Sequence, residues 1–196
     1  MAKGASADAG MTLAELMVAM AVTSVVMLVA TAGMVQMYRA GNRTDVLSGE
    51  MTQLQTAFQA LDRSVRYATA ISQPNTSPSA GGDWYVEWSS LDGTTTACSQ
   101  LRLDPSAGLL QRRSEPAAGQ LGAWATVASF LAGTQPFTLE PASTSGYPHQ
   151  RLTVDVTVRP ATGSSSSARR SIFSFTALNT TLATVSTGVC SDMSRP

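Results

Sequence analysis

The chain has 196 residues, 43% of them hydrophobic, and its 13 basic side chains balance 13 acidic ones, so the formal net charge is zero. This balance excludes a general electrostatic attraction to nucleic acid or to anionic lipid. With one histidine and two cysteines, the sequence also lacks a two-histidine metal site, a CxxC pair and the nucleotide-binding glycine motifs. We therefore expect no enzyme activity, no metal and no cofactor.

An apolar stretch lies near the N-terminus. From Leu16 to Met37, every residue is apolar or small except Gln36 and three residues with hydroxyl groups. As a helix this stretch would be about 33 Å long, enough to cross the roughly 30 Å hydrocarbon core of a bilayer. Just before it, Thr12 and Glu15 have the spacing of a capping box, which satisfies free amide groups at a helix start.

Three ordinary interpretations of this stretch are open. It could be a plain membrane anchor, a secretory signal peptide, or a buried helix of a soluble core. Ala30-Thr31-Ala32 before Gly33 is a signal-peptide cleavage pattern, but the apolar run is longer than usual and Lys3 is the only basic residue before it. No sequence after Met37 is apolar enough to surround a buried helix.

A fourth interpretation accounts for more of the residues. The order and spacing at the start of the stretch resemble the class III signal of type IV prepilins and type II secretion pseudopilins. The residues that carry the resemblance are Gly10, Met11, Thr12, Leu13 and Glu15. The resemblance implies that residues 1–10 are a leader, that a prepilin peptidase cuts between Gly10 and Met11, and that Met11 becomes N-methylated. It also implies that Glu15 pairs with the amino terminus of a neighbouring subunit, whereas a simple helix cap needs no neighbour.

A second helical pattern covers residues 38–73. Apolar residues recur there at alternating steps of four and three, which places them on one face of a helix. This head-packing stripe consists of Leu47, Met51, Leu54, Phe58, Leu61, Val65 and Ala68. If residues 11–37 and this segment form one helix, its length is about 90 Å, similar to the long first helix of pilins.

Residues 74–196 read as a β-rich head. Pro74 to Gly82 is a proline- and glycine-containing linker that ends the helix. Alternating or hairpin patterns then predict strands at residues 84–88, 101–103, 109–113, 152–158 and 173–177, with less clear segments at 124–131 and 136–140. One helix followed by hairpins predicts an α+β, pilin-like fold in which an antiparallel sheet packs on the stripe.

The cysteines and a few polar residues have simple interpretations. Outside the cytoplasm, Cys98 and Cys190 would favour a disulfide worth on the order of 4 kcal/mol, although two free thiols remain the alternative. His149 is predicted to be a solvated loop residue. The arginine pairs 112–113 and 169–170 are predicted to be solvated hairpin ends.

The resemblance implies a role in assembly. A minor pilin or pseudopilin would be inserted in the cell membrane as a single-pass protein with its N-terminus cytoplasmic and its head extracytoplasmic. Its partners would be prepilin peptidase, the lipid bilayer, the inner-membrane assembly platform and the other subunits of a type IV pilus or type II secretion pseudopilus. Pieces of the head resemble J-type minor pseudopilins, namely residues 58–66, 101–113 and 173–179.

Two other functions are open. The first is a membrane-tethered or secreted binding domain that does not polymerise and recognises a surface ligand through Trp84, Trp88 and Trp124. The second is a competence-type minor pilin that binds DNA. The neutral net charge counts against the second, so we expect no nucleic-acid partner.

Overall fold

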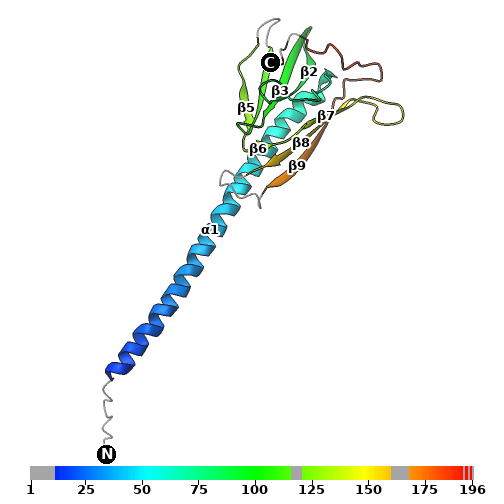
Figure 1. Cartoon of the computed structure of the whole chain (residues 1–196). Coiled ribbons are helices and arrows are strands. Elements are labelled where there is room, and N and C mark those ends of the chain that lie inside the picture. Colours follow the sequence, from blue (N-terminus) through cyan, green and yellow to red (C-terminus); the bar gives the residue numbers. More distant parts are fainter. Residues whose placement is uncertain (1–11, 116–120, 160–167, 192, 194, 196) are drawn as a thin grey trace, which may run out of the picture. The chain divides into compact units, whose positions relative to one another are not determined.

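The computed structural model describes residues 12–115, 121–159 and 168–191, together with 193 and 195. Within the helix, the backbone of residues 43–51 and 53 is described but their side chains are not. The chain divides into two compact units, residues 1–46 and residues 47–196. One helix extends from the first unit into the second, and all the described strands belong to the second (Figure 1).

Helix α1 spans Leu13–Arg66 and continues through Gly33. Alanine, leucine and methionine, which are strong helix formers, are frequent in its first half. The prediction that the helix reaches residue 73 is wrong, because residues 68–71 pair with β2 as strand β1. The backbone N–H of Leu178 donates to the carbonyl of Arg66 at 2.9 Å, which satisfies one of the free carbonyls at the helix end.

Five antiparallel strands form the first sheet, in the order β1-β2-β3-β4-β5. Gly93, with a φ of 63°, turns β2 into β3. The Asp104 carboxylate accepts hydrogen bonds from the backbone N–H groups of Ser106 and Ala107 and so shapes the turn between β3 and β4, the hairpin predicted at residues 101–113. The strands are β1 (Ala68–Ile71), β2 (Trp84–Asp92), β3 (Thr95–Asp104), β4 (Leu109–Glu115) and β5 (Ala125–Ala128).

A second antiparallel sheet is built around β8, which pairs with β6, β7 and β9. The alternation that predicted β8 is confirmed, since its four apolar side chains are at most 1% exposed while the residues between them are half-buried. The strands are β6 (Leu131–Ala132), β7 (Phe137–Glu140), β8 (Arg151–Val158) and β9 (Arg169–Thr176).

The hydrophobic core lies between the C-terminal part of α1 and the two sheets. Phe58 on the helix stacks on Phe173 of β9, with ring centroids 3.7 Å apart, and also contacts Phe175. Leu61 and Val65 continue the buried helix face toward the first sheet. The predicted α+β class, with a long N-terminal helix and an antiparallel head, is confirmed.

Candidate functional site

The start of α1 forms a complete capping box. The backbone N–H and the hydroxyl of Thr12 both donate to Oε2 of Glu15 at 3.1 Å, and the backbone N–H of Glu15 donates to Oγ1 of Thr12 at 3.3 Å. These bonds satisfy amide groups that the first helical turn leaves free. The carboxylate of Glu15 is thus held at the mouth of the helix, and Leu13 is the first helical residue.

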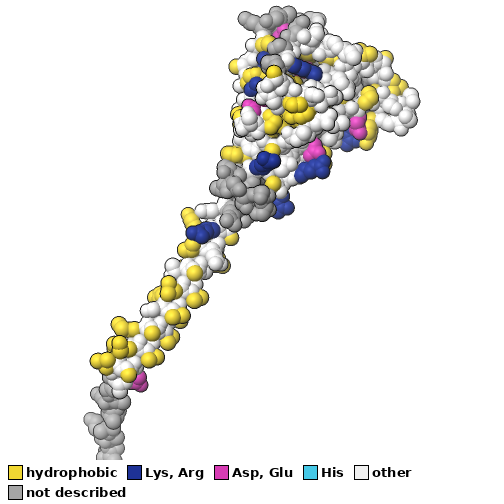
Figure 2. Space-filling model, viewed as in Figure 1, with side chains coloured by type: hydrophobic (Ala, Val, Ile, Leu, Met, Phe, Trp, Pro, Cys, Tyr) yellow, Lys and Arg dark blue, Asp and Glu magenta, His cyan; other side chains and the backbone are white. Residues whose placement is uncertain are grey.

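The helix then presents apolar side chains on every face. Within the segment Leu13–Asn42, the most apolar window of 18 residues has a mean hydropathy of 2.2 and none of it is buried. By length and composition, the segment could cross a membrane. Figure 2 shows apolar side chains along the described part of this helix. The hydroxyls of Thr23, Ser24 and Thr31 donate to carbonyls four residues earlier at 2.7 to 2.8 Å, so they carry no unsatisfied donor into apolar surroundings.

A comparison with family models identifies this element. The model described as a prokaryotic N-terminal methylation motif matches residues 5–31. The chain carries the class III signal of type IV pilins and pseudopilins. No curated protein and no solved structure matches the chain significantly.

Only part of the class III signal lies among the residues that the structure describes. Gly10 and Met11, where we predict cleavage and N-methylation, lie outside the described residues. Thr12, Leu13 and Glu15 are described and form the helix start given above. The motif implies processing by a prepilin peptidase, and the apolar helix that follows it is a candidate membrane anchor.

The head-packing stripe is buried wherever its side chains are described. Leu54, Phe58, Leu61 and Val65 are 1 to 3% exposed. The side chains of Leu47 and Met51 lie outside the described part of the chain. Ala68 is also buried, but it belongs to β1 and not to the helix.

The three tryptophans do not form a common ligand surface. Trp84 and Trp88 are 6% and 0% exposed and lie in the core beside α1. Trp124 lies over the opposite face of the first sheet, where the guanidinium groups of Arg102 and Arg113 are both 4.4 Å from its ring centroid. The hypothesis of a binding domain required Trp84, Trp88 and Trp124 to form one exposed surface, and their positions contradict it.

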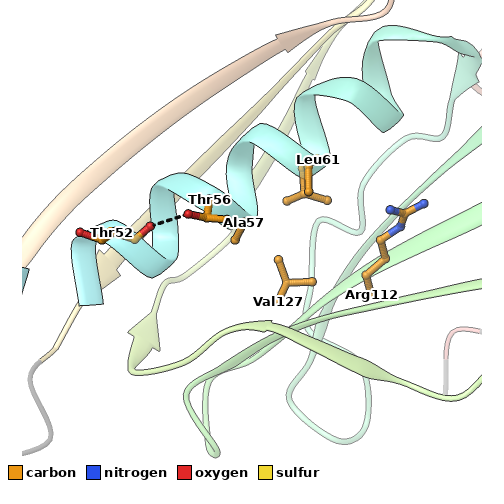
Figure 3. A pocket seen from close by; sticks show the side chains of 7 residues that line it. Thr52, Thr56, Ala57, Leu61, Arg112 and Val127 are labelled. Atoms are coloured by element: carbon orange, nitrogen blue, oxygen red, sulfur yellow. Dashed lines mark hydrogen bonds between the residues drawn. The ribbon is translucent and has the colours of Figure 1, made fainter. Parts of the chain in front are cut away.

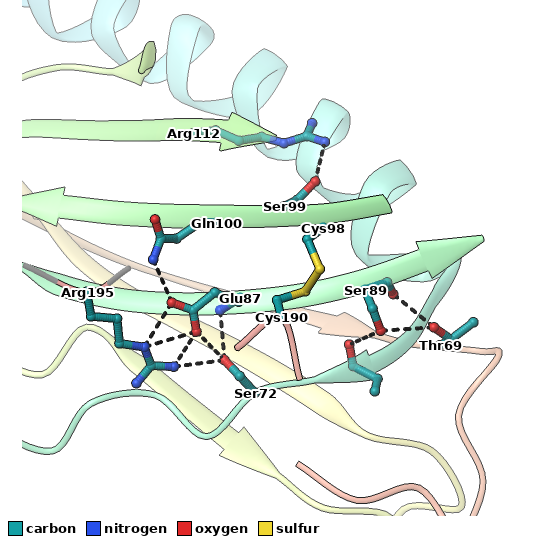
Figure 4. The surroundings of a disulfide bond; sticks show 11 residues. Thr69, Ser72, Glu87, Ser89, Cys98, Ser99, Gln100, Arg112, Cys190 and Arg195 are labelled. Atoms are coloured by element: carbon teal, nitrogen blue, oxygen red, sulfur yellow. Dashed lines mark hydrogen bonds and ion pairs between the residues drawn. A yellow bond between two sulfur atoms is a disulfide. The ribbon is translucent and has the colours of Figure 1, made fainter. Parts of the chain in front are cut away.

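A disulfide and an ion pair hold the C-terminal segment against the first sheet (Figure 4). Cys190 is disulfide-bonded to Cys98 of β3, with the two Cα atoms 5.7 Å apart. Arg195 donates through Nε to both carboxylate oxygens of Glu87, at 2.9 and 3.1 Å, and its Nη2 also contacts that carboxylate. Gln100 and Ser72 donate to the same carboxylate at 2.7 and 2.6 Å, so a 2% exposed carboxylate has a full set of partners.

Two of the simple interpretations of polar residues are wrong. His149 is half-buried, and its Nδ1 lies 2.6 Å from the carbonyl of Thr180, so Nδ1 is the protonated donor. Arg112 and Arg113 are also half-buried. They lie on opposite faces of β4, and each packs against an aromatic ring, Arg112 against Trp88 and Arg113 against Trp124. Arg170 on β9 is exposed, as predicted, and pairs with Asp155.

A groove of about 440 Å³ lies between α1 and strands β4 and β5 (Figure 3). The helix contributes mainly small side chains, among them Thr56, whose hydroxyl donates to the Thr52 carbonyl at 3.0 Å. Val127 lines the other wall, and Arg112 reaches the same groove from β4. The described residues contain no cluster of three or more histidine, cysteine or acidic side chains suited to a metal ion.

Sequence patterns located the start of α1 but missed the features of the head that involve charge. The capping box depends on residues three positions apart, so its spacing is visible in the sequence. Glu87 and Arg195 are 108 positions apart in the sequence. The burial of Arg112 depends on its contact with Trp88, which belongs to another strand. The neighbouring residues in the sequence do not indicate that Glu87 and Arg195 form an ion pair, because the two lie far apart in the chain.

Proposed function

We propose that the chain is a minor subunit of a type IV pilus or type II secretion pseudopilus, inserted in the cell membrane, processed by prepilin peptidase and assembled through α1. The class III signal supports the processing step. The single observation that supports assembly is the exposed apolar surface of the helix segment Leu13–Asn42. None of the most apolar window of this segment is buried. Such a surface requires lipid before assembly and the helices of other subunits afterwards.

Glu15 is the residue in which the proposal can be tested. A carboxylate costs on the order of 2.5 to 3.5 kcal/mol at the centre of a bilayer, so it needs the interface or a partner. As the fifth residue of the mature chain, it would pair with the amino terminus of a neighbouring subunit while the helix leaves the membrane. The alternative role is the cap alone, which Thr12 already completes within one chain.

Two variants separate these roles. Glu15→Gln keeps a side chain that can complete a capping box but removes the charge. Thr12→Val keeps the charge but removes the hydroxyl, at a cost of about 1 kcal/mol. We expect Glu15→Gln to remain in the membrane and to lose at least about 90% of its cross-linking to other subunits, and Thr12→Val to retain most of it.

The readout is chemical cross-linking in membranes of the native host, followed by immunoblotting, with intact mass used to verify equal processing of each variant. An absence of wild-type cross-linking to other subunits would contradict a filament subunit and favour a tethered domain that does not polymerise. Equal cross-linking of wild type and Glu15→Gln would show that assembly does not use the charge of Glu15. An equal loss in both variants would show that the cap is what matters. The finer assignment to the J-type subunit is also a prediction, supported by the three head segments that resemble it.

A further inference from the structure

Arg112 is a cation without an acidic partner among the described residues. Its Nη2 donates to Oγ of Ser99 at 3.1 Å (Figure 4). Its guanidinium carbon lies 5.5 Å from the ring centroid of Trp88. None of the ion pairs formed in the described parts of the chain includes it. Burial lowers the pKa of Arg112, yet an arginine remains charged at any physiological pH.

A polar cleft of about 960 Å³ opens beside this guanidinium. It lies between the last turn of α1, the β2–β3 hairpin and β4, and we name it the Arg112 cleft. Hydroxyl groups line it from several elements, namely those of Ser64, Ser90, Thr95, Thr96, Ser99 and Ser114. Tyr67, which is 61% exposed, places an aromatic ring at its edge.

The charge of Arg112 indicates which group a ligand would bring. A partly desolvated guanidinium gains most from a carboxylate, which can accept two of its N–H groups in one plane. Ser99 supplies only one neutral acceptor. Arg63 also lines the cleft and adds a second positive charge.

The rest of the lining decides between two kinds of carboxylate ligand. Asp92 and Glu115 also line the cleft, and they would repel an acidic peptide that carries several negative charges. The same carboxylates, together with the serine and threonine hydroxyls, suit a ligand with one carboxylate and many hydroxyl groups. The apolar face of a sugar ring also packs well on an exposed aromatic ring such as that of Tyr67.

We propose that the Arg112 cleft binds a sugar acid of the uronate type, with the carboxylate on Arg112 and the ring hydroxyls on the surrounding hydroxyl and carboxylate groups. The volume of the cleft falls within the range of small-ligand sites and is large enough for a short oligosaccharide. All the residues that line this cleft belong to the second unit, whereas the start of α1 belongs to the first, so uronate binding can be tested independently of filament assembly.

The test is isothermal titration calorimetry on the full-length protein in a detergent without a sugar headgroup. The probes are galacturonate, a short neutral oligosaccharide that ends in a single uronate, glucose, acetate and an oligoglutamate peptide. We expect the two uronates to bind at least about tenfold more tightly than glucose or acetate, because only they supply both the carboxylate and the hydroxyls. If the oligomer binds and the monomer does not, the ligand is the polysaccharide chain and not a free sugar acid.

Two variants and a control locate the binding. Arg112→Gln should weaken uronate binding at least about tenfold, the usual effect of losing a hydrogen bond to a charged group. Tyr67→Ala, at an exposed position, should also weaken it, so the proposal remains testable if Arg112→Gln does not fold. Arg169→Gln removes an exposed arginine on β9 and should bind as wild type does. Tighter binding of oligoglutamate than of uronate, no uronate binding at 10 mM, or equal binding by all three variants would overturn the proposal.

Discussion

Glu87 is a carboxylate that the fold keeps away from water, at 2% exposure. A buried charge is tolerated only when cations and hydrogen-bond donors replace its hydration. Here the replacement comes from Ser72, Gln100 and, from near the end of the chain, Arg195. The residue that balances the charge therefore also holds the C-terminal segment in place.

Replacing Arg195 tests this balance. Arg195→Ala should lower the free energy of unfolding by about 1 to 3 kcal/mol, less than for a fully buried pair because the Arg195 side chain is 33% exposed. Arg195→Lys, which keeps the charge, should lose less. The measurement is denaturant unfolding followed by tryptophan fluorescence, and Arg169→Ala is the matched control, with an expected change below about 0.5 kcal/mol. An unchanged stability in Arg195→Ala would mean that the ion pair with Glu87 does not form.

At the scale of elements, the buried face of α1 is the feature that the sequence predicted best. Its apolar residues recur with the helical period over several turns, so the pattern can be recognised without knowing what covers it. The end of the helix could not be predicted in the same way. Ala68 fits the helical stripe equally well, and only its pairing with Ser90 of β2 places it in a strand. Tertiary pairing, which no local pattern records, overrode the periodicity.

Leu61 provides the test of the helix face. It is 2% exposed and lies in the core between α1 and the sheets. Leu61→Ala should destabilise the head by about 2 to 5 kcal/mol, the cost of lost burial plus a cavity. Gln59→Ala, an exposed change on the same helix, should stay within about 0.5 kcal/mol of wild type. Equal unfolding midpoints for the two variants would show that this face does not pack on the head.

At the scale of the whole molecule, the disulfide joins residues 92 positions apart, from the middle of the head to its last segment. In the chain-entropy model, closing a loop of this length contributes about 4 to 5 kcal/mol. The double variant Cys98→Ser, Cys190→Ser should therefore unfold at a lower denaturant concentration than wild type, and wild type in reductant should behave similarly. Alkylation followed by mass analysis should label two thiols only after reduction. Labelling of both cysteines without reductant would contradict the bond.

The central claim is that this chain is a processed subunit of a filament, and its most direct test is intact-mass and N-terminal analysis of the protein recovered from membranes. The account predicts a chain that begins at Met11 and is one methyl group heavier than its sequence requires. A chain that begins at Gly33 would mean a secreted domain released from a signal peptide. A chain that begins at Met1 would mean an ordinary anchor, and either of these two results would contradict the account.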